Sequence, residues 1–291
     1  MRAFDFLSPV TVVEALELLH EHKDSVAIVA GGTDIVLELN ERHIKPAVVM
    51  DIKRLKELEY ITIEDGIVRI GAMTTHAAIA ADERIKKHAK ILWEACRLVG
   101  SPQIRNLGTI GGNIATSSVA GDGLAACVTL DADVTVKSVR GERTMKLDEY
   151  LAGEGFSKRN IMEADELLTE VSFKLPDERT ATGFYKLAKR KSLAISVIGA
   201  GMVVSVDENG ICTYARLRAG ALGRYPMPFV AVEEYLVGKK LTMENVKAAL
   251  PLMGEHVMTV NKGRASAVYK KDAVQGAYEH LFEDAIAELG L

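Results

Sequence analysis

Two pairs of consecutive glycines, each beside a threonine and a polar side chain, are the residues of this chain best suited to binding an anion. They lie in the segments VAGGTDI (29–35) and TIGGN (109–113). Glycine adopts positive φ and lets the backbone approach a ligand closely, so several N–H donors can converge on one phosphate. A dinucleotide diphosphate needs such donors, and two loops could hold it from two sides. A helix starting just after each loop would add a favourable dipole.

Each pair taken alone is ambiguous. A lone Gly-Gly is more often a turn or bulge than a ligand site, and only the presence of two such loops favours binding. The chain has no G-x-G-x-x-G after a strand, which argues against a Rossmann nucleotide site. The glycines at 199–201 are predicted to allow close packing in a strand.

The bulk composition is that of an ordinary globular chain. Its 291 residues, 48% hydrophobic and 26% charged, predict two domains. A formal net charge of −4 gives no footprint for nucleic acid or an anionic membrane. The N-terminus lacks a secretory pattern and no apolar run is long enough to span a bilayer, so a cytoplasmic location is expected. Three dispersed cysteines, Cys96, Cys127 and Cys212, argue against a disulfide framework and against metal ligation.

The apolar spacing predicts the elements that must position the loops. In the first part of the chain these are a capped helix opening at Thr11, strands at 25–30, 46–52 and 166–176, hairpins turning at Asp65-Gly66 and Arg140-Gly141, and a helix at 84–100 ending at Gly100. The polar segment 176–183 is a linker candidate. Beyond it we predict a small antiparallel sheet and then helices. Because strands and helices segregate there, the fold class is α+β.

Longer motifs around the two loops resemble one known family. The segments AGGTD, SPQIRNLGTIGGN and FYKLAKRKSLAISVIGAGM, with the Gly-Asp pair at 121–122, are similar to the flavin-binding medium subunits of molybdenum hydroxylases. This family includes subunits of carbon monoxide, xanthine and nicotinate dehydrogenases. The resemblance covers essentially the whole chain, and the motifs look closest to the nicotinate dehydrogenase flavin subunit.

The resemblance implies a fold and a cofactor. Residues 1–176 would form a two-lobed FAD-binding domain of the vanillyl-alcohol-oxidase (PCMH) type, with lobes of roughly 1–55 and 56–176. Residues 177–291 would form a small C-terminal domain of antiparallel sheet plus helices. By family pattern, the residues expected to contact FAD are Val29, Ala30, Gly31, Gly32, Thr33, Asp34, Ile35, Thr109, Ile110, Gly111, Gly112, Asn113, Ala115, Thr116, Asp122, Leu168 and Lys186.

Some of these residues have a plainer interpretation from the sequence alone. Asp122 could be an ordinary helix N-cap, Leu168 a core residue and Lys186 part of a solvated basic cluster. The neighbouring triplet Lys189-Arg190-Lys191 would suit the extra phosphate of NADP, although a bland surface patch is an equal alternative. We nominate no catalytic residue, and the chain's histidines are expected to be exposed or in the core.

The function that the resemblance implies is electron transfer. The chain would pass electrons from 2Fe–2S clusters of a small partner subunit through FAD to NADP or NAD. Flavin suits this role because it exchanges electrons singly with clusters and in pairs with a nicotinamide. The molybdenum cofactor would lie on a large subunit, in a dimer of heteromers, with nicotinate as first substrate and a purine such as xanthine as the alternative. A free-standing flavin oxidoreductase and a non-enzymatic nucleotide-binding module are remoter alternatives.

Overall fold

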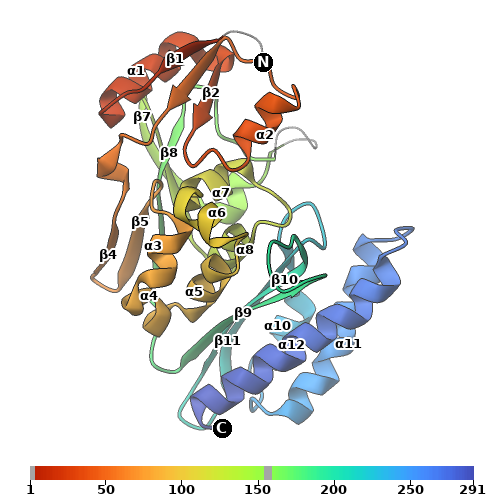
Figure 1. The fold of residues 1–291 in the computed structure, drawn as a ribbon. Helices are drawn as coiled ribbons and strands as arrows, with labels where there is room; N and C mark the ends of the chain where they lie inside the picture. The colour runs from red at the N-terminus through yellow and green to blue at the C-terminus, as the bar shows by residue number, and fades with distance from the viewer. Residues whose placement is uncertain (1–3, 154–158) are drawn as a thin grey trace. The chain divides into compact units, whose positions relative to one another are not determined.

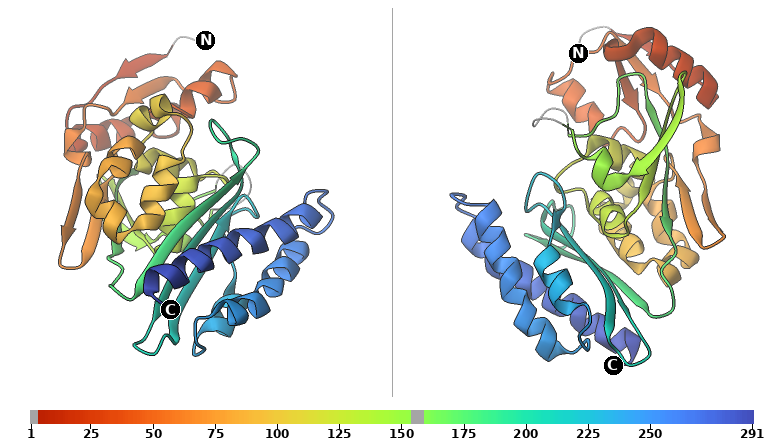
Figure 2. Two further views of the ribbon diagram at one scale, coloured as in Figure 1. Left: turned by 60° about the horizontal axis from the view of Figure 1, so that its bottom comes forward. Right: turned by 180° about the vertical axis from the view of Figure 1, so that it is seen from behind.

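The computed structural model describes residues 4–153 and 159–291, which form two compact units (Figure 1, Figure 2). Unit 1 comprises Met1–Ile79, Pro102–Ser117 and Asp131–Lys174. Unit 2 comprises Ala80–Ser101, Ser118–Leu130 and Leu175–Leu291. The units do not follow chain order, because two segments of the first half pack with the C-terminal part.

Unit 1 contains a small parallel sheet in the order β1-β3-β2. Its elements are β1 (Asp5–Leu7), α1 (Val12–His22), η1 (Lys23–Ser25), β2 (Val26–Val29), α2 (Ile35–Asn40) and β3 (Val48–Asp51). The predicted cap is confirmed, since Thr11 Oγ1 accepts from the Glu14 N–H at 3.2 Å. Leu16 and Leu19 of α1 pack with Met50 in one core cluster beneath the sheet. This packing fixes the end of β2, where the first glycine loop begins.

The second sheet of unit 1 has five strands in the order β4-β5-β8-β6-β7, all paired antiparallel. Its strands are β4 (Ile61–Glu64), β5 (Ile67–Gly71), β6 (Asp133–Ser138), β7 (Gly141–Lys146) and β8 (Leu167–Lys174). The remaining elements of the unit are η2 (Lys56–Leu58), α6 (Pro102–Leu107), α7 (Ile110–Thr116) and α9 (Leu147–Tyr150); α3 (His76–Ala81) runs from unit 1 into unit 2. Both predicted hairpins form, and Asp65 and Gly66 take positive φ as a tight turn requires.

Unit 2 is built on an antiparallel sheet in the order β12-β11-β10-β9. Its elements are α4 (Glu83–His88), α5 (Lys90–Arg97), α8 (Asp122–Thr129), β9 (Thr180–Ala188), β10 (Ser196–Val206), β11 (Cys212–Gly220), β12 (Met227–Pro228), α10 (Val230–Leu236), α11 (Met243–Val260) and α12 (Ala267–Leu289). Ala200 and Met202 of β10 join the core shared with α10, α11 and α12. On the opposite face Gly201 meets α8, where an added Cβ would lie 2.4 Å from Thr129 Oγ1. The predicted packing role of these strand glycines is confirmed.

Two predicted boundaries are wrong. The helix expected at 84–100 is two helices, because Ala89 leaves helical geometry at φ −139° and ψ 54°. The second ends at Arg97 rather than at Gly100. Buried apolar side chains lie on both sides of the break, so the apolar spacing does not reveal it. The linker candidate is also too long, since β9 already begins at Thr180.

The three cysteines are free thiols in the core, and the prediction that they bind no metal stays a prediction. All three cysteines are buried and reduced, and burial raises the thiol pKa of each. Within the described residues no cluster of His, Cys, Asp and Glu is arranged to hold a metal ion. The same part of the chain has no helix that is both long and apolar enough to cross a membrane.

Candidate cofactor site

The first glycine loop has four consecutive backbone donors without a partner among the described residues. It follows β2 and leads into α2, and Gly32 adopts φ +76°, a conformation that favours glycine. Across residues 4–153 and 159–291, the backbone N–H groups of Gly31, Gly32, Thr33 and Asp34 find no acceptor. Consecutive open amides of this kind form a nest suited to an anion. The α2 helix has only six residues, so its dipole adds less than the sequence suggested.

The two glycine loops interlock. A Cβ added to Gly31 would lie 2.1 Å from the carbonyl oxygen of Leu107 and 2.9 Å from Cα of Gly108. A Cβ on Gly108 would lie 3.5 Å from Thr33 Oγ1, and one on Gly112 would lie 3.8 Å from Cβ of Ala30. Segments almost eighty residues apart are therefore in backbone contact, as one shared phosphate site requires.

The second loop uses most of its amides inside the protein. The Gly111 N–H donates to Ala72 O at 2.9 Å, and the Gly112 N–H donates to Thr109 Oγ1 at 3.0 Å. The N–H groups of Ile110 and Asn113 are also bonded, which leaves the Thr109 N–H as the loop's one amide without an acceptor among the described residues. Thr109 is the N-cap of α7. This loop positions the first loop and contributes few donors of its own.

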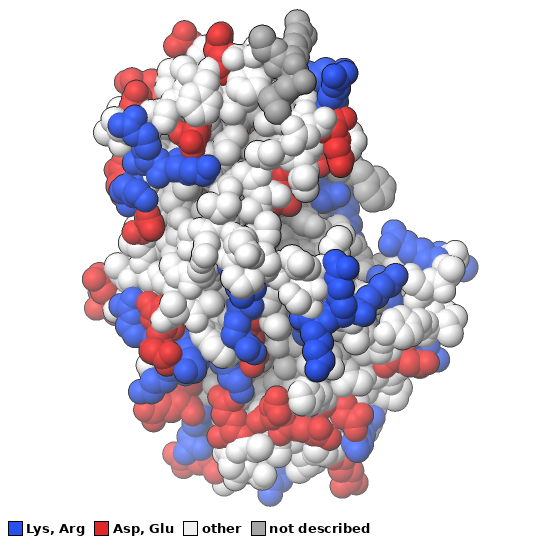
Figure 3. All heavy atoms as spheres, in the orientation of Figure 1, with Lys and Arg blue, Asp and Glu red and all other residues white. Residues whose placement is uncertain are grey.

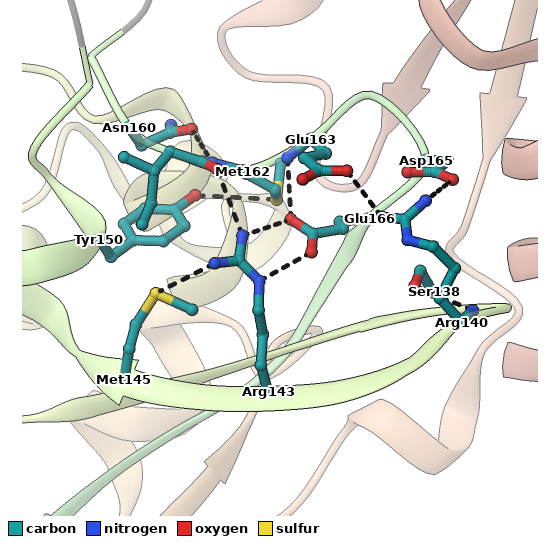
Figure 4. Close-up of polar contacts among 11 residues, drawn as sticks. Ser138, Arg140, Arg143, Met145, Tyr150, Asn160, Met162, Glu163, Asp165 and Glu166 are labelled. Carbon is teal, nitrogen blue, oxygen red and sulfur yellow. Dashed lines mark hydrogen bonds and ion pairs between the residues drawn. The ribbon is translucent and has the colours of Figure 1, made fainter.

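Asn160 braces the end of α7, and Figure 4 shows the polar contacts of the segment that carries Asn160. Asn160 Nδ2 donates to Ala115 O at 2.9 Å and to Ser117 Oγ at 3.0 Å, and Ser117 ends the helix at φ 50°. The segment after Asn160 is held by two arginines of the β6–β7 hairpin. Arg143 donates to both carboxylate oxygens of Glu166 at 2.8 Å, and Arg140 pairs with Asp165. The backbone around the predicted residues Ala115 and Thr116 is thus fixed by side chains from elsewhere in unit 1.

Three of the predicted contact residues are core residues. Val29, the last residue of β2, belongs to a small core cluster, and Ile110 is fully buried. Leu168 is buried in β8, where it pairs with Val136 of β6. Their side chains are enclosed by the protein, so any part they take in ligand binding falls to their backbone. The plainer interpretation of Leu168 as a core residue agrees with its burial.

Asp122 and Lys186 form a buried ion pair in unit 2. Their side chains are 5% and 9% exposed, and Lys186 Nζ lies 2.6 Å from Asp122 Oδ2. Ser196 Oγ donates to Asp122 Oδ1 at 2.5 Å, and Lys186 also donates to Leu98 O at 3.0 Å. Burial raises the pKa of Asp122, although the charge and hydrogen bonds of Lys186 oppose this.

This pair corrects two plainer interpretations. Lys186 belongs to no solvated surface, and the N-cap of α8 is Gly121, with Asp122 as the first helical residue. A carboxylate has about four acceptor positions, so Asp122 could still accept a hydroxyl from a ligand.

A buried histidine, His76, contacts the residue that precedes the second loop. The His76 N–H donates to Gly108 O at 2.9 Å, and its ring lies 3.3 Å from where a Cβ of Gly108 would be. Burial, with the nearby charge of Arg105, lowers the pKa of His76 to about 4. The imidazole is therefore neutral at physiological pH, as expected of a core histidine.

The triplet Lys189-Arg190-Lys191 lies in the exposed connection between β9 and β10. The Arg190 guanidinium donates to Leu193 O, and Leu193 holds φ +53°. One of the three cations is therefore engaged in shaping its own loop. Lys189 and Lys191 are exposed, and within the described part of the chain they form no ion pair.

Comparison with known protein families identifies the class of protein to which this chain belongs. Residues 2–176 match the family described as "FAD binding domain in molybdopterin dehydrogenase", and residues 183–285 match "CO dehydrogenase flavoprotein C-terminal domain". The first match alone covers more than half of the chain. The chain therefore belongs to the family of FAD-binding oxidoreductase subunits of molybdenum hydroxylases.

Individual relatives span nearly the full length. The chain is 54% identical over 290 residues to the nicotinate dehydrogenase FAD-subunit of Eubacterium barkeri, which covers 99% of this chain and 98% of the relative. It is 29% identical to the xanthine dehydrogenase FAD-binding subunit of Escherichia coli O157:H7, with 99% and 98% covered. A chain of reconstituted CO dehydrogenase from Oligotropha carboxidovorans superposes with a TM-score of 0.90 at 25% identity, with 99% of each chain covered. These likenesses confirm the predicted fold class.

Several residues that shape the site were missed from the sequence. Gly108, Asn160 and Ser196 each fix a predicted residue, but none lies within a glycine pair or beside a charge cluster. Gly108 directly precedes Thr109, so a third glycine next to the second loop was the one available signal. The other two act through contacts between distant segments, which spacing does not report.

Proposed function

We propose that this chain is the FAD-carrying electron-transfer subunit of a nicotinate dehydrogenase, which converts nicotinate to 6-hydroxynicotinate with NAD(P) as acceptor. The observation that supports it most directly is the row of four open amides in Gly31–Asp34, locked against the second loop. This row fits the diphosphate of a dinucleotide, and the 54% identity to a nicotinate dehydrogenase FAD-subunit supports the substrate.

Residues of this chain would hold and orient the cofactor. The amides of Gly31–Asp34 and Thr109 would bind the diphosphate, with Thr33 Oγ1 as an added donor. Asp122, oriented by Lys186 and Ser196, would accept a hydrogen bond from a cofactor hydroxyl. Bound FAD supplies the exchange between one-electron carriers and a two-electron nicotinamide. No general acid or base is required of this chain.

We further propose that the remaining redox groups lie on partners. The molybdenum cofactor and the 2Fe–2S clusters would be on large and small subunits, because the described residues of this chain offer no cluster of metal ligands. The exposed Lys189 and Lys191 would favour NADP over NAD through its extra phosphate. Neutralising Lys189, Arg190 and Lys191 together should then lower the NADP/NAD preference of the assembled enzyme, and an unchanged preference would refute this assignment.

The test of the function begins with the purified chain. We expect a yellow protein with a flavin absorbance spectrum that turns over no heterocycle by itself. A colourless protein that ignores added FAD would overturn the proposal, and substrate oxidation by the lone chain would favour a free-standing flavin enzyme.

The assembled complex decides the substrate. It should reduce NADP or NAD with nicotinate. Activity with xanthine and none with nicotinate would favour the purine enzyme, which the 29% identity to a xanthine dehydrogenase subunit keeps as the second candidate.

A further inference from the structure

The connection between the last two helices carries an unbalanced positive charge. We call residues 256–271 the hairpin tip. It comprises the last residues of α11, the connection after Val260 and the first residues of α12. The tip contains Lys262, Arg264, Lys270 and Lys271 and no acidic residue, in a chain whose formal net charge is −4. Figure 3 shows Lys and Arg gathered at this end of the helix pair, with Asp and Glu gathered away from it.

The charges of the tip are not compensated within the chain. Over the described residues, Lys262, Arg264 and Lys271 form no ion pair with any carboxylate. Lys270 is partly buried, and its Nζ donates to Ala221 O at 2.5 Å. Burial and the charge of Arg264 lower the pKa of Lys270. Like charges held together in this way repel one another, and this lowers stability unless an anion is brought near.

Large apolar side chains are exposed among these cations. Val268 is 64% exposed, Tyr269 57%, Val260 50% and Met258 37%. Exposed apolar residues scattered singly need no explanation, but four in one short segment beside unpaired cations do. Protein–protein interfaces are enriched in aromatic residues, Met and Arg, and Tyr269, Met258 and Arg264 of the tip are of these types, while its lysines suit the charged rim of an interface.

Hydrogen bonds define the turn of the tip. The Asn261 side chain is buried and donates to Leu222 O at 2.8 Å and to Val257 O at 3.2 Å. The turn continues with hydrogen bonds from Arg264 N to Asn261 O and from Ala267 N to Arg264 O, both at 3.0 Å. A surface ordered in advance loses less conformational entropy when it binds.

We propose that the hairpin tip docks an acidic, partly apolar face of a partner subunit of the complex. This inference rests on the proposed function, because it requires that the chain works within a multi-subunit enzyme. The cations would pair with partner carboxylates around a contact made by Val268 and Tyr269. Such charge pairs speed association and set the orientation of the partner.

A second copy of this chain is a poorer occupant. The C-terminal half of α12 carries four carboxylates, and three of them are already paired within unit 2; Glu283 forms no ion pair among the described residues. Glu279 pairs with Lys247, Glu288 with Lys90, and Asp284 with His280. A contact between the tip of one copy and this different surface of another copy would also be a head-to-tail interface. Repeated head-to-tail interfaces give rings or open filaments.

Ala221, which accepts the hydrogen bond from Lys270 of the tip, is also bonded to the segment that precedes Asp122. The Ala221 N–H donates to Val119 O at 2.6 Å, while Ala221 O accepts from Lys270. Ala221 holds φ +64°, an uncommon conformation for a residue with a Cβ, so this junction is constrained. A partner bound at the tip would thus fix the backbone three residues from Asp122.

The first test is charge reversal in the intact complex. Lys262→Glu, Arg264→Glu and Lys271→Glu are introduced together, and subunit retention is followed by native mass spectrometry across a KCl series, with partners identified by their molybdenum and iron content. We expect association at least about tenfold weaker, with dissociation at lower salt. The matched control reverses Lys45, Lys53 and Arg54, which are exposed cations of unit 1. Equal weakening by the control, or none by the tip variant, would overturn the proposal.

A second test needs no substitution. A carbodiimide joins lysine amines directly to carboxylates in contact with them, and peptide mass spectrometry locates the links. We expect Lys262 and Lys271 to link to aspartates or glutamates of a partner subunit. Links from other lysines only, or to a second copy of this chain, would refute the assignment. The flavin spectrum of the same sample tests the proposed function separately, because none of the residues proposed to contact FAD lies in the tip.

Discussion

The two glycine loops share a sequence pattern but differ in what their backbones do. The first leaves four consecutive N–H groups open to a ligand, whereas the second bonds the N–H groups of both its glycines to the protein. Gly32 is required for its positive φ, while Gly111 is required because α7 lies directly against Ala72. A Gly-Gly pair can therefore leave its amides open or use them in packing, and the candidate site combines one pair of each kind.

The division of roles explains why the loops must touch. Open amides bind a phosphate well only if they are ordered before the ligand arrives. The contact of Gly31 with Leu107 and the cap at Thr109 provide this order without using the amides of the first loop. Substitutions that act on packing and on the open amides should therefore have separable effects.

Gly31→Ala is expected to have the largest effect, because it breaks the contact between the loops. Its Cβ would lie 2.1 Å from a backbone oxygen that cannot turn aside. We expect a loss of about 3 kcal/mol or more in the free energy of unfolding. The folded fraction should also retain FAD at least about tenfold less well. Urea denaturation and flavin fluorescence titration measure the two quantities.

Gly32→Ala is the matched control. Its Cβ would meet Val36 Cγ2 at 3.4 Å and Val29 Cγ1 at 3.6 Å, both ordinary contacts, so the cost is that of holding alanine at positive φ, about 1–2 kcal/mol. If Gly32→Ala destabilised the chain more than Gly31→Ala, close contact between the loops would not be what holds the site.

Gly111→Ala should separate stability from binding. Its Cβ would lie 2.5 Å from Cβ of Ala72 and 2.6 Å from its carbonyl oxygen, which predicts a loss of about 1–3 kcal/mol of stability. The open amides of the first loop are not touched by this change, so FAD affinity per folded molecule should fall less than in Gly31→Ala. Equal losses of affinity in the two variants would show that both loops bind the ligand alike.

Local patterns predicted much of the fold. The Thr11 cap and the hairpins at Asp65-Gly66 and Arg140-Gly141 involve residues close in sequence, and all formed as expected. The break at Ala89 was missed because buried side chains continue on both sides of it. The start of β9 was missed because Thr180 lies in a segment whose polarity is typical of a linker.

The site could be predicted in part. The proximity of the two glycine loops was expected, because one dinucleotide diphosphate held from two sides would bring them together, and the contact is present; that they bind FAD stays a prediction. The sequence could not show that the N–H groups of Gly111 and Gly112 are hydrogen-bonded within the protein. Their acceptors are Ala72 O and Thr109 Oγ1, and the direction of the Thr109 side chain depends on α7. The burial of Lys186 beside Asp122 was hidden for a similar reason, because the two are 64 residues apart.

Thr109→Ala tests the cap of the second loop at a smaller scale. It removes the acceptor for the Gly112 N–H, and the loss of an N-cap costs about 1 kcal/mol. Thr109→Ser keeps the hydroxyl and should recover most of that loss, which urea denaturation would measure. If serine were no better than alanine, the hydroxyl would not be the group that orders the loop.

Acid should produce the smallest effect, and it should act on the second loop alone. Burial opposes ionisation of Glu166, but hydrogen bonds from Arg143 and the Glu163 N–H outweigh it and lower its pKa. Because the folded pKa lies below the unfolded value, this stabilisation is complete above about pH 4.3 and is lost as the pH falls through the folded value. Hydrogen exchange, corrected for intrinsic rates, should then show α7 loosening as the pH falls below about 4.3 while the backbone of β2 stays protected. Glu166→Gln should remove most of this pH dependence, whereas equal loosening of β2 in the wild type would mean that the brace serves both loops.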